Sequence, residues 1–297
     1  MKSSNAELFA QLTEVTKDLE FPISCSSNPI HPFIWEVETL GEFNIESLLK
    51  TTTPDFSEYS EGGKIMRNGD LEAYWQLVLL QAQKHSPETL QKYQTLINLL
   101  KSHLTNLELL KIRTLHDPKD NFHIIVGQSA SGEWVGISAN IPADNEDCGQ
   151  MGIYNSEQIF VNQYQPETEA TANLVDRLQQ LSQHLDFFEP EIFGFYTDKG
   201  WTVRVGATRE SMIHSLLEAI GFARTFPVCK MFHEEEYYDE EELSDAQVYL
   251  ALDEFLLANI SNLRTYMFGM TVSYVFYIVG QTSSGDWAGV TSLAAWA

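Results

Sequence analysis

Apolar residues spaced three and four positions apart predict several amphipathic helices along the chain. Residues 93–107 and 249–263 each place Leu, Ile and Tyr side chains on one helical face. Residues 71–83 repeat the same spacing, with apolar positions at Leu71, Tyr74, Trp75, Val78 and Leu79. We therefore expect each of these helices to bury one face.

Two further stretches have the pattern of β-hairpins. "FHIIVGQ" and "SYVFYIVGQ" are rich in β-branched and aromatic residues, and the turns "SASG" and "TSSG" follow them directly. A second strand then begins at Trp134 or at Trp287. Gly136 and Gly289 lie inside these return strands, which indicates a bulge or the close approach of a helix.

The two hairpins belong to a longer repeat. "IVGQSASGEWVGIS" at residues 125–138 and "IVGQTSSGDWAGVT" at residues 278–291 share eight of fourteen residues. Upstream helices and "SLL" motifs match in the same order, and Trp35 matches Trp201 at the offset of the first helices. The chain is therefore predicted to be a tandem duplication, with Trp35 superposing on Trp201 and Trp134 on Trp287.

Each copy is predicted to contain a helix, a strand, further helices and the hairpin. This order favours an α+β fold, with two copies of an α/β/α sandwich whose sheet is mainly antiparallel. The predicted boundaries are a first domain at residues 1–143, a linker at 144–165 and a second domain at 166–297. The helix at residues 71–83 is predicted to be an insertion that the second copy lacks.

The chain is strongly acidic, with a formal net charge of −24. Because this charge repels nucleic acid and anionic membranes, it favours a basic protein partner, a cation or simply solubility. Three widely spaced cysteines predict a reducing compartment, and no signal-peptide core or membrane-spanning run is present in the sequence. We therefore predict a cytoplasmic protein without direct nucleic acid or membrane binding.

The sequence contains no constellation that would support an enzyme. The eight histidines form no HxxxH or HExxH pair, and no phosphate-binding glycine motif occurs. "GQSASG" differs from a nucleophile elbow in its length and in joining strand to strand. We therefore predict no catalytic residues, no metal ligands and no cofactor.

The hairpin "YIVGQTSSGDWAGVTS", the upstream "FIWE" and the helices that end in "NL" resemble the nuclease A inhibitor family. The resemblance covers roughly residues 12–141 and 174–293. It implies small α/β/α sandwich domains that bind a sugar-nonspecific, Mg²⁺-dependent nuclease and block its active site. It further implies two inhibitory groups: a Glu in the loop after the first helix, and the residues that follow the hairpin.

Carried onto this sequence, the resemblance points to the second copy. Its loop contains Glu189 and Glu191, whereas the first copy has Ser24 and Cys25 at the aligned place. The sequence ends at Trp296 and Ala297, whose carboxylate is the second candidate group. Trp296 either anchors in a groove of the partner or packs on its own domain.

We predict that Glu189, Glu191 and the Ala297 carboxylate lie on one edge of the second copy, with an acidic run at residues 234–242 beside it. The run consists of Glu234, Glu235, Glu236, Tyr237, Tyr238, Asp239, Glu240, Glu241 and Glu242. It is either a solvated loop and helix start, a patch that mimics nucleic acid, or a weak Ca²⁺ site without EF-hand spacing. We predict a protein-binding inhibitor of a basic nuclease; the alternative is a non-inhibitory acidic interaction module on the same fold.

Overall fold

The computed structural model describes residues 3–21, 28–51, 63–113, 121–139, 164–183, 185, 201–227, 240–270 and 273–295. The helices are α1 (Ser3–Val15), α2 (Val37–Leu40), α3 (Ile45–Lys50), α4 (Leu71–His85), α5 (Pro87–His103), α6 (Glu169–Ser182), α7 (Arg209–Ala219) and α8 (Glu240–Asn259). The strands are β1 (His31–Trp35), β2 (Met66–Gly69), β3 (Leu104–Arg113), β4 (Asn121–Ser129), β5 (Trp134–Ala139), β6 (Trp201–Gly206), β7 (Ala223–Pro227), β8 (Ser261–Met270), β9 (Ser273–Gln281) and β10 (Trp287–Ala295).

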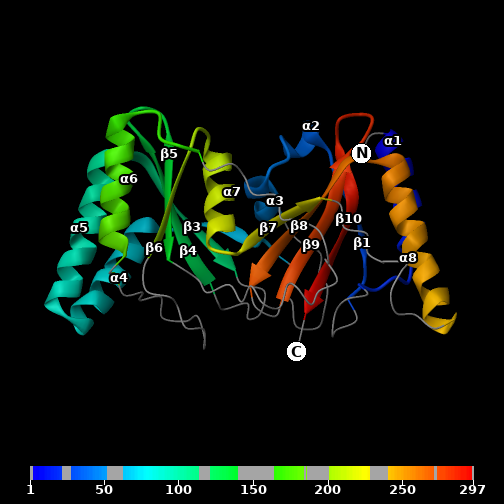
Figure 1. Ribbon diagram of the computed structural model, residues 1–297, viewed down its shortest axis with the longest axis horizontal. Helices are drawn as coiled ribbons and strands as arrows, with labels where there is room; N and C mark the ends of the chain where they lie inside the picture. The colour runs from blue at the N-terminus through cyan, green and yellow to red at the C-terminus, as the bar shows by residue number, and fades with distance from the viewer. Residues whose placement is uncertain are drawn as a thin grey trace.

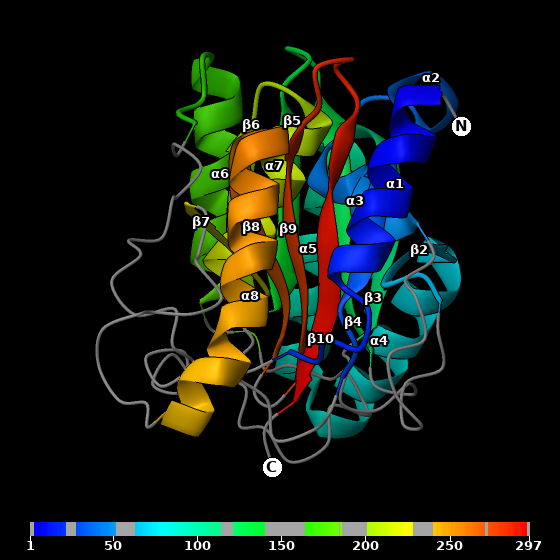
Figure 2. The same cartoon turned by 90° about the vertical axis from the view of Figure 1, so that its right-hand side faces the viewer.

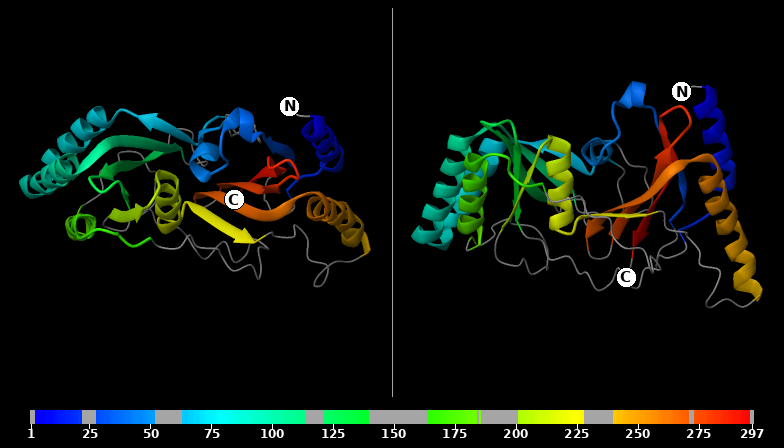
Figure 3. Two further views of the ribbon diagram at one scale, coloured as in Figure 1. Left: turned by 90° about the horizontal axis from the view of Figure 1, so that it is seen from above. Right: turned by 45° about the horizontal axis from the view of Figure 1, so that its top comes forward.

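These elements form five layers. Helices α4, α5 and α6 cover the outer side of one sheet, and α1 and α8 cover the outer side of the other, with α3 and α7 between the two sheets (Figure 1). The view from above in Figure 3 shows the same layers. Both sheets are antiparallel and each has helices on both faces, so the predicted α+β fold is confirmed.

The strand order shows that the two sequence repeats exchange their first strands. One sheet has the order β2-β3-β4-β5-β6, and the other has the order β1-β10-β9-β8-β7. Strand β1 of the first repeat therefore pairs with β10 of the second, and β6 of the second repeat pairs with β5 of the first. Helices α1 and α6 pack on the exchanged strands, so each sheet contains strands from both predicted domains.

The register of the exchanged strands corrects one part of the predicted repeat alignment. Trp35 lies opposite Trp287, at the start of β10. At the start of β5, Trp134 lies opposite Gly206, whereas Trp201 lies five residues earlier, opposite Ala139. Trp35 is therefore structurally equivalent to Gly206 and not to Trp201. The sequence match of the two tryptophans follows the offset between α1 and α6. A different number of residues, however, separates the first helix from the first strand in the two repeats.

Among the described residues, the largest apolar core lies between the sheets and contains residues from both repeats. Leu48 and Leu49 of α3 and Leu216 and Leu217 of α7 are all fully buried there, together with inward-facing residues of both sheets. At about 25 cal/mol per Å² of buried apolar surface, a core of this kind provides much of the free energy that stabilises a domain. Because this core is shared, the two repeats form one packed body.

The outer helices bury their predicted apolar faces. The inserted segment forms helix α4, as expected, and its Tyr74, Trp75 and Val78 are buried against α5 and the β2–β6 sheet. On the other flank, α1 and α8 lie over β8, β9 and β10 (Figure 2). Helices α5 and α8 end at His103 and Asn259, earlier than predicted, because the chain turns directly into β3 and β8.

Candidate functional site

Most of the predicted partner-binding residues lie outside the described part of the structure. This holds for Glu189, Glu191, Trp296 and Ala297, and for Glu234, Glu235, Glu236, Tyr237, Tyr238 and Asp239. Glu240, Glu241 and Glu242 form the first residues of α8, but their side chains lie outside the description too. The arrangement of this candidate site therefore stays a prediction.

The described residues that flank the site belong to two different sheets. Trp201, which follows the segment with the two candidate glutamates, begins β6 and pairs with Ala139 of β5. Ala295, which precedes the last two residues, ends β10 and pairs with Ser273 of β9. The described residues next to the two candidate groups, Trp201 and Ala295, therefore belong to separate sheets, which the sequence repeat did not indicate.

The repeated turn motif has a clear role in the β2–β6 sheet. Glu133, which is 5% exposed, lies at the end of the first turn and accepts hydrogen bonds from the segment before α6. Its Oε1 atom accepts from the Glu167 N–H at 2.8 Å, and its Oε2 atom accepts from Thr168 Oγ1 at 3.1 Å and from Ser131 Oγ at 2.7 Å. Thr168 is also the N-cap of α6, because its side chain accepts from the Thr171 N–H. A carboxylate of the first repeat thereby fixes a helix of the second.

In the second turn motif, the equivalent carboxylate of Asp286 binds the first repeat. Asp286 is 1% exposed, and its Oδ2 atom accepts from Asn5 Nδ2 in α1 at 3.0 Å. Its Oδ1 atom accepts from the Val37 N–H, which begins α2, also at 3.0 Å. Ser284 Oγ donates to Oδ2 within the turn. Asp286 therefore holds the exchanged segment of the first repeat on both sides of β1.

We call Glu133 and Asp286 the latch carboxylates. Sequence reasoning treated the motif as turn chemistry and did not assign these two acids. A signal was present, because both copies carry an acidic residue between the turn glycine and the tryptophan. What the sequence did not indicate is that each acid binds the opposite repeat.

The hydrogen bonds to Glu133 make its contribution dependent on pH. Burial alone would raise the pKa of this carboxyl, but the Glu167 N–H and the hydroxyls of Thr171, Ser131 and Thr168 outweigh it and lower the pKa below 4.5. A carboxyl whose pKa is lowered by folding stabilises the protein above its ordinary pKa. That stabilisation is lost as the pH falls through the lowered value.

We therefore expect Glu133→Gln to destabilise the protein at pH 7 by about 1–2 kcal/mol. The difference between the wild type and the variant should shrink as the pH falls below 4.5, because the wild-type carboxyl becomes protonated. Urea unfolding at pH 7, 5 and 3 measures this. A matched control is Glu88→Gln, because Glu88 is exposed on α5. A difference between wild type and Glu133→Gln that stays constant down to pH 3 would contradict the assignment.

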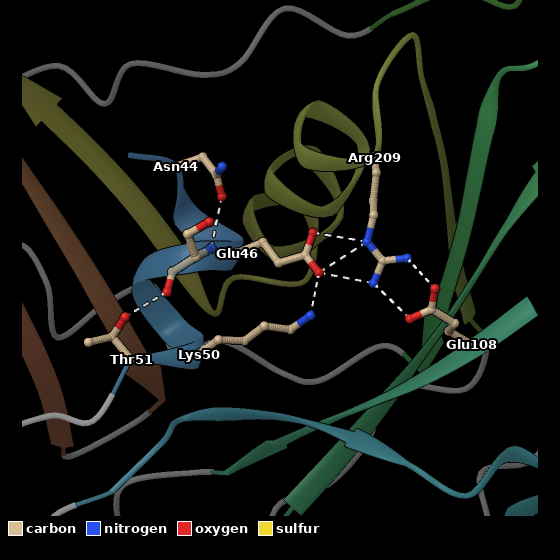
Figure 4. Close-up of polar contacts among 7 residues, drawn as sticks. Asn44, Glu46, Lys50, Thr51, Glu108 and Arg209 are labelled. Carbon is tan, nitrogen blue, oxygen red and sulfur yellow. Dashed lines mark hydrogen bonds and ion pairs between the residues drawn. The ribbon is translucent and has the colours of Figure 1, made fainter. Parts of the chain in front are cut away.

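A second charged cluster joins the repeats between the sheets (Figure 4). The guanidinium of Arg209, at the start of α7, donates to Glu46 of α3 at 2.9–3.0 Å and to Glu108 of β3 at 3.0–3.1 Å. Lys50 Nζ binds the same Glu46 carboxylate at 2.7 Å. Burial would raise the pKa of Glu46, but the hydrogen bonds and charges of Arg209 and Lys50 lower it overall. Arg209 also lies over the Trp134 ring.

These clusters hold segments of the two repeats together. Their carboxylates accept hydrogen bonds from backbone, hydroxyl, amide and guanidinium donors, which engage both oxygens of each carboxylate. Within the described ranges, no group of three His, Cys, Asp or Glu side chains is placed to hold a metal ion. None of the described helices combines the length and apolarity that a membrane span requires.

Comparison with known proteins identifies the family of the two repeats. A family model for nuclease A inhibitor-like proteins matches residues 6–141 and residues 214–294, together more than half of the chain. The chain belongs to the nuclease A inhibitor-like family. A search of curated proteins finds no match.

The two family matches differ in where they begin. The first covers the repeat from α1 to β5, whereas the second begins inside α7 and so leaves α6 and β6 outside it. The structure nevertheless pairs β6 with β5 and packs α6 on β6, just as it pairs β1 with β10 and packs α1 on β1. The described elements of the second nuclease A inhibitor-like repeat therefore follow the order of the first apart from α2 and α4, although the family model does not match its first part.

Proposed function

We propose that this protein is a binding inhibitor of a basic, sugar-nonspecific, Mg²⁺-dependent nuclease. The observation that carries the proposal is the family match over two regions of one chain. The formal net charge of −24 supports it, because an acidic protein is steered toward the basic surroundings of a nuclease active site.

In this mechanism an acidic group of the inhibitor replaces a substrate phosphate. A Mg²⁺ nuclease holds its metal with few protein ligands and several waters, which leaves positions open for phosphate oxygens. A carboxylate can occupy such a position or bind the metal's waters. Glu189, Glu191 and the Ala297 carboxylate remain the proposed groups, with the acidic run at residues 234–242 as a steering surface.

The proposal is tested by titrating the full chain against a purified nuclease of this class while DNA cleavage is measured. We expect Glu189→Gln with Glu191→Gln to weaken inhibition by about 2 kcal/mol at low and at high salt, because a truncated charge contact mainly affects dissociation. Neutralising four acids of the run should slow association at low salt only. Glu72→Gln with Glu88→Gln is the matched control, since it removes two exposed carboxylates on α4 and α5.

Trp201 and Ala295, which flank the glutamate pair and the C-terminal residues, lie on different sheets. A double-mutant cycle therefore decides whether these two groups act together. One variant carries the Glu189 and Glu191 changes, and the other lacks Trp296 and Ala297, which leaves β10 intact. A shared contact region predicts a coupling energy of about 0.5–3 kcal/mol, whereas separate regions predict additive losses. Additivity would overturn the prediction that these groups form one edge.

The alternative is an acidic interaction module that binds a basic protein without inhibiting a nuclease. One observation favours it: the first repeat has Ser24 and Cys25 where the family resemblance implies a glutamate. Binding to the nuclease without loss of cleavage would support this alternative. No binding and no inhibition would remove the nuclease proposal.

A further inference from the structure

Helix α4 exposes apolar side chains on the face opposite its packed one. Leu77 and Leu80 are 41% and 49% exposed, whereas Tyr74, Trp75 and Val78 are buried against the rest of the fold. Leu77 and Leu80 are three positions apart, so they lie on one side of the helix, one turn from each other. Single exposed apolar residues are common on protein surfaces, but a helix with apolar residues on opposite faces is suited to packing on both sides.

A row of basic side chains crosses the sheet next to α4. Arg67 of β2 lies opposite Lys111 of β3, and Lys111 lies opposite His123 of β4. Arg67 and Lys111 are exposed, and within the described residues neither forms an ion pair. Like charges directly opposite on neighbouring strands destabilise a sheet. The Tyr74 ring packs on the His123 ring with centroids 4.7 Å apart, so this row borders α4.

The equivalent row in the second repeat is buried and contains a single base. Arg224 of β7 lies opposite Met267 of β8, and Met267 lies opposite Phe276 of β9. Met267 is the counterpart of Lys111, because each follows the positive-φ Asn of its β-bulge by five residues. Phe21 stacks on Phe276 with ring centroids 4.8 Å apart and covers part of this row. The exposed basic row therefore distinguishes the first repeat from the second, as α4 does.

The opposite flank of the molecule carries a surface of complementary charge. Helix α8 contains six acidic residues and no Lys, Arg or His. Its Val248 and Leu257 are 48% and 51% exposed, and Glu254 is exposed on the same helix. By contrast, residues 66–113, which run from β2 to β3 and include α4 and α5, contain six Lys and Arg and four Asp and Glu, a formal charge of +2. Both flanks thus combine exposed apolar side chains with charge, and the charges are of opposite sign.

The two surfaces are placed so that only separate copies can bring them together. The α4 surface consists of Arg67, Leu77, Leu80 and Lys111, and the α8 surface consists of Val248, Glu254 and Leu257. Helices α4 and α8 lie on opposite flanks, with both sheets between them (Figure 1). Contact between the two surfaces within one chain would require the packed sheets to come apart.

From this complementarity we infer that copies of this chain bind one another head to tail, with the α4 surface of one copy on the α8 surface of the next. Because the two surfaces differ, each copy in a pair keeps one free surface, and the contact repeats into short chains or a ring. The net charge of each copy opposes association, but at about 0.15 M salt it is screened beyond about 8 Å, whereas the facing charges lie closer. A contact of one helix with one helix and part of a sheet belongs to the small, transient class of interfaces.

Sedimentation velocity of the full-length protein measures this association. The protein is examined from about 10 µM to about 1 mM in about 0.15 M salt, the range in which a weak contact becomes populated. We expect the mean sedimentation coefficient to rise with concentration as copies add to one another.

Two variants each remove one surface. The α4 variant carries Leu77→Gln, Leu80→Gln and Lys111→Gln, and the α8 variant carries Val248→Gln, Glu254→Gln and Leu257→Gln. All six side chains are exposed, and Gln introduces no new charge and keeps a high helix propensity. Because each variant loses both the apolar and a charged part of one surface, we expect self-association at least about tenfold weaker.

A mixture of the two variants decides whether the contact is head to tail. The α4 variant keeps its α8 surface and the α8 variant keeps its α4 surface, so one intact contact can form between them. Mixed in equal amounts, they should form a heterodimer that does not grow further, although neither variant associates alone. The control, Leu40→Gln with Glu42→Gln, removes an exposed apolar and an exposed acidic side chain near α2 and should associate as the wild type does.

Three results would overturn the inference. One is a wild-type protein that stays monomeric up to about 1 mM. Another is self-association that either variant retains, because the contact would then not need both surfaces. The third is a mixture that stays monomeric after both variants have lost self-association. Heterodimer formation in the mixture also shows that both variants are folded, so loss of association in each alone cannot be ascribed to misfolding.

Discussion

Arg209→Met should lower the free energy of unfolding by about 3–5 kcal/mol, because it removes the cation from a buried cluster. The Glu46 side chain is 9% exposed and receives three of its four hydrogen bonds from this guanidinium. Without Arg209, Glu46 keeps only Lys50, and Glu108 loses both bonds described for it. Urea unfolding at pH 7, monitored by tryptophan fluorescence, measures the loss.

Two comparisons make this expectation specific. Lys92→Met removes the cation of an exposed pair with Glu88 on α5 and should change stability by less than about 1 kcal/mol. Arg209→Met combined with Glu46→Leu should recover part of the loss, because no buried carboxylate then lacks its partner. If the double variant is as unstable as the sum of the two single variants, the cluster does not act as a coupled unit.

Gly289→Ala should cost about 4 kcal/mol or prevent folding, because two effects add at this position. The backbone of Gly289 has a φ of 152°, which side chains with a Cβ rarely adopt. A Cβ would also overlap the backbone carbonyl oxygen of Ile278 on the neighbouring strand β9. Since this neighbour is backbone, the two strands would have to separate locally.

Two other glycines of the same repeated motif are the controls. Gly285→Ala has the strain of a φ of 81°, but its Cβ would meet no atom within 4 Å. We therefore expect it to lower the free energy of unfolding by about 1–2 kcal/mol. At Gly136, a Cβ would overlap Met212 Sδ of α7, a flexible side chain that can move, and about 1–3 kcal/mol is expected. A smaller loss for Gly289→Ala than for Gly136→Ala would contradict this account.

Gly136 and Gly289 show what a sequence pattern can predict about packing and what it cannot. Glycine inside both return strands predicted a bulge or a close helix, and Gly136 does lie against Met212 and Leu216 of α7. Gly289 occupies the same place in the repeat but faces a neighbouring strand. The residue type indicated that space was restricted, but only the packed structure shows which atoms restrict it.

For the candidate site too, the sequence indicated some residues and missed others. The acidic candidates were chosen from residue type and family resemblance, and their arrangement stays a prediction. The latch carboxylates and the Arg209 cluster were not predicted, because each joins residues of opposite repeats, which lie far apart in the sequence. The spacing of neighbouring residues does not indicate such a contact.

The sequence by itself determined the α+β class, the duplication, the apolar faces of the helices and the family. Those properties follow from local periodicity and from residue identity, which are present in an unfolded chain. Tertiary structure alone decided which sheet each first strand joins. The residues of a strand such as β1 are the same whichever edge it pairs with, so its sequence pattern does not distinguish β5 from β10. The choice depends on the connections and on contacts such as that of Asn5 with Asp286, which exist only once both repeats are folded.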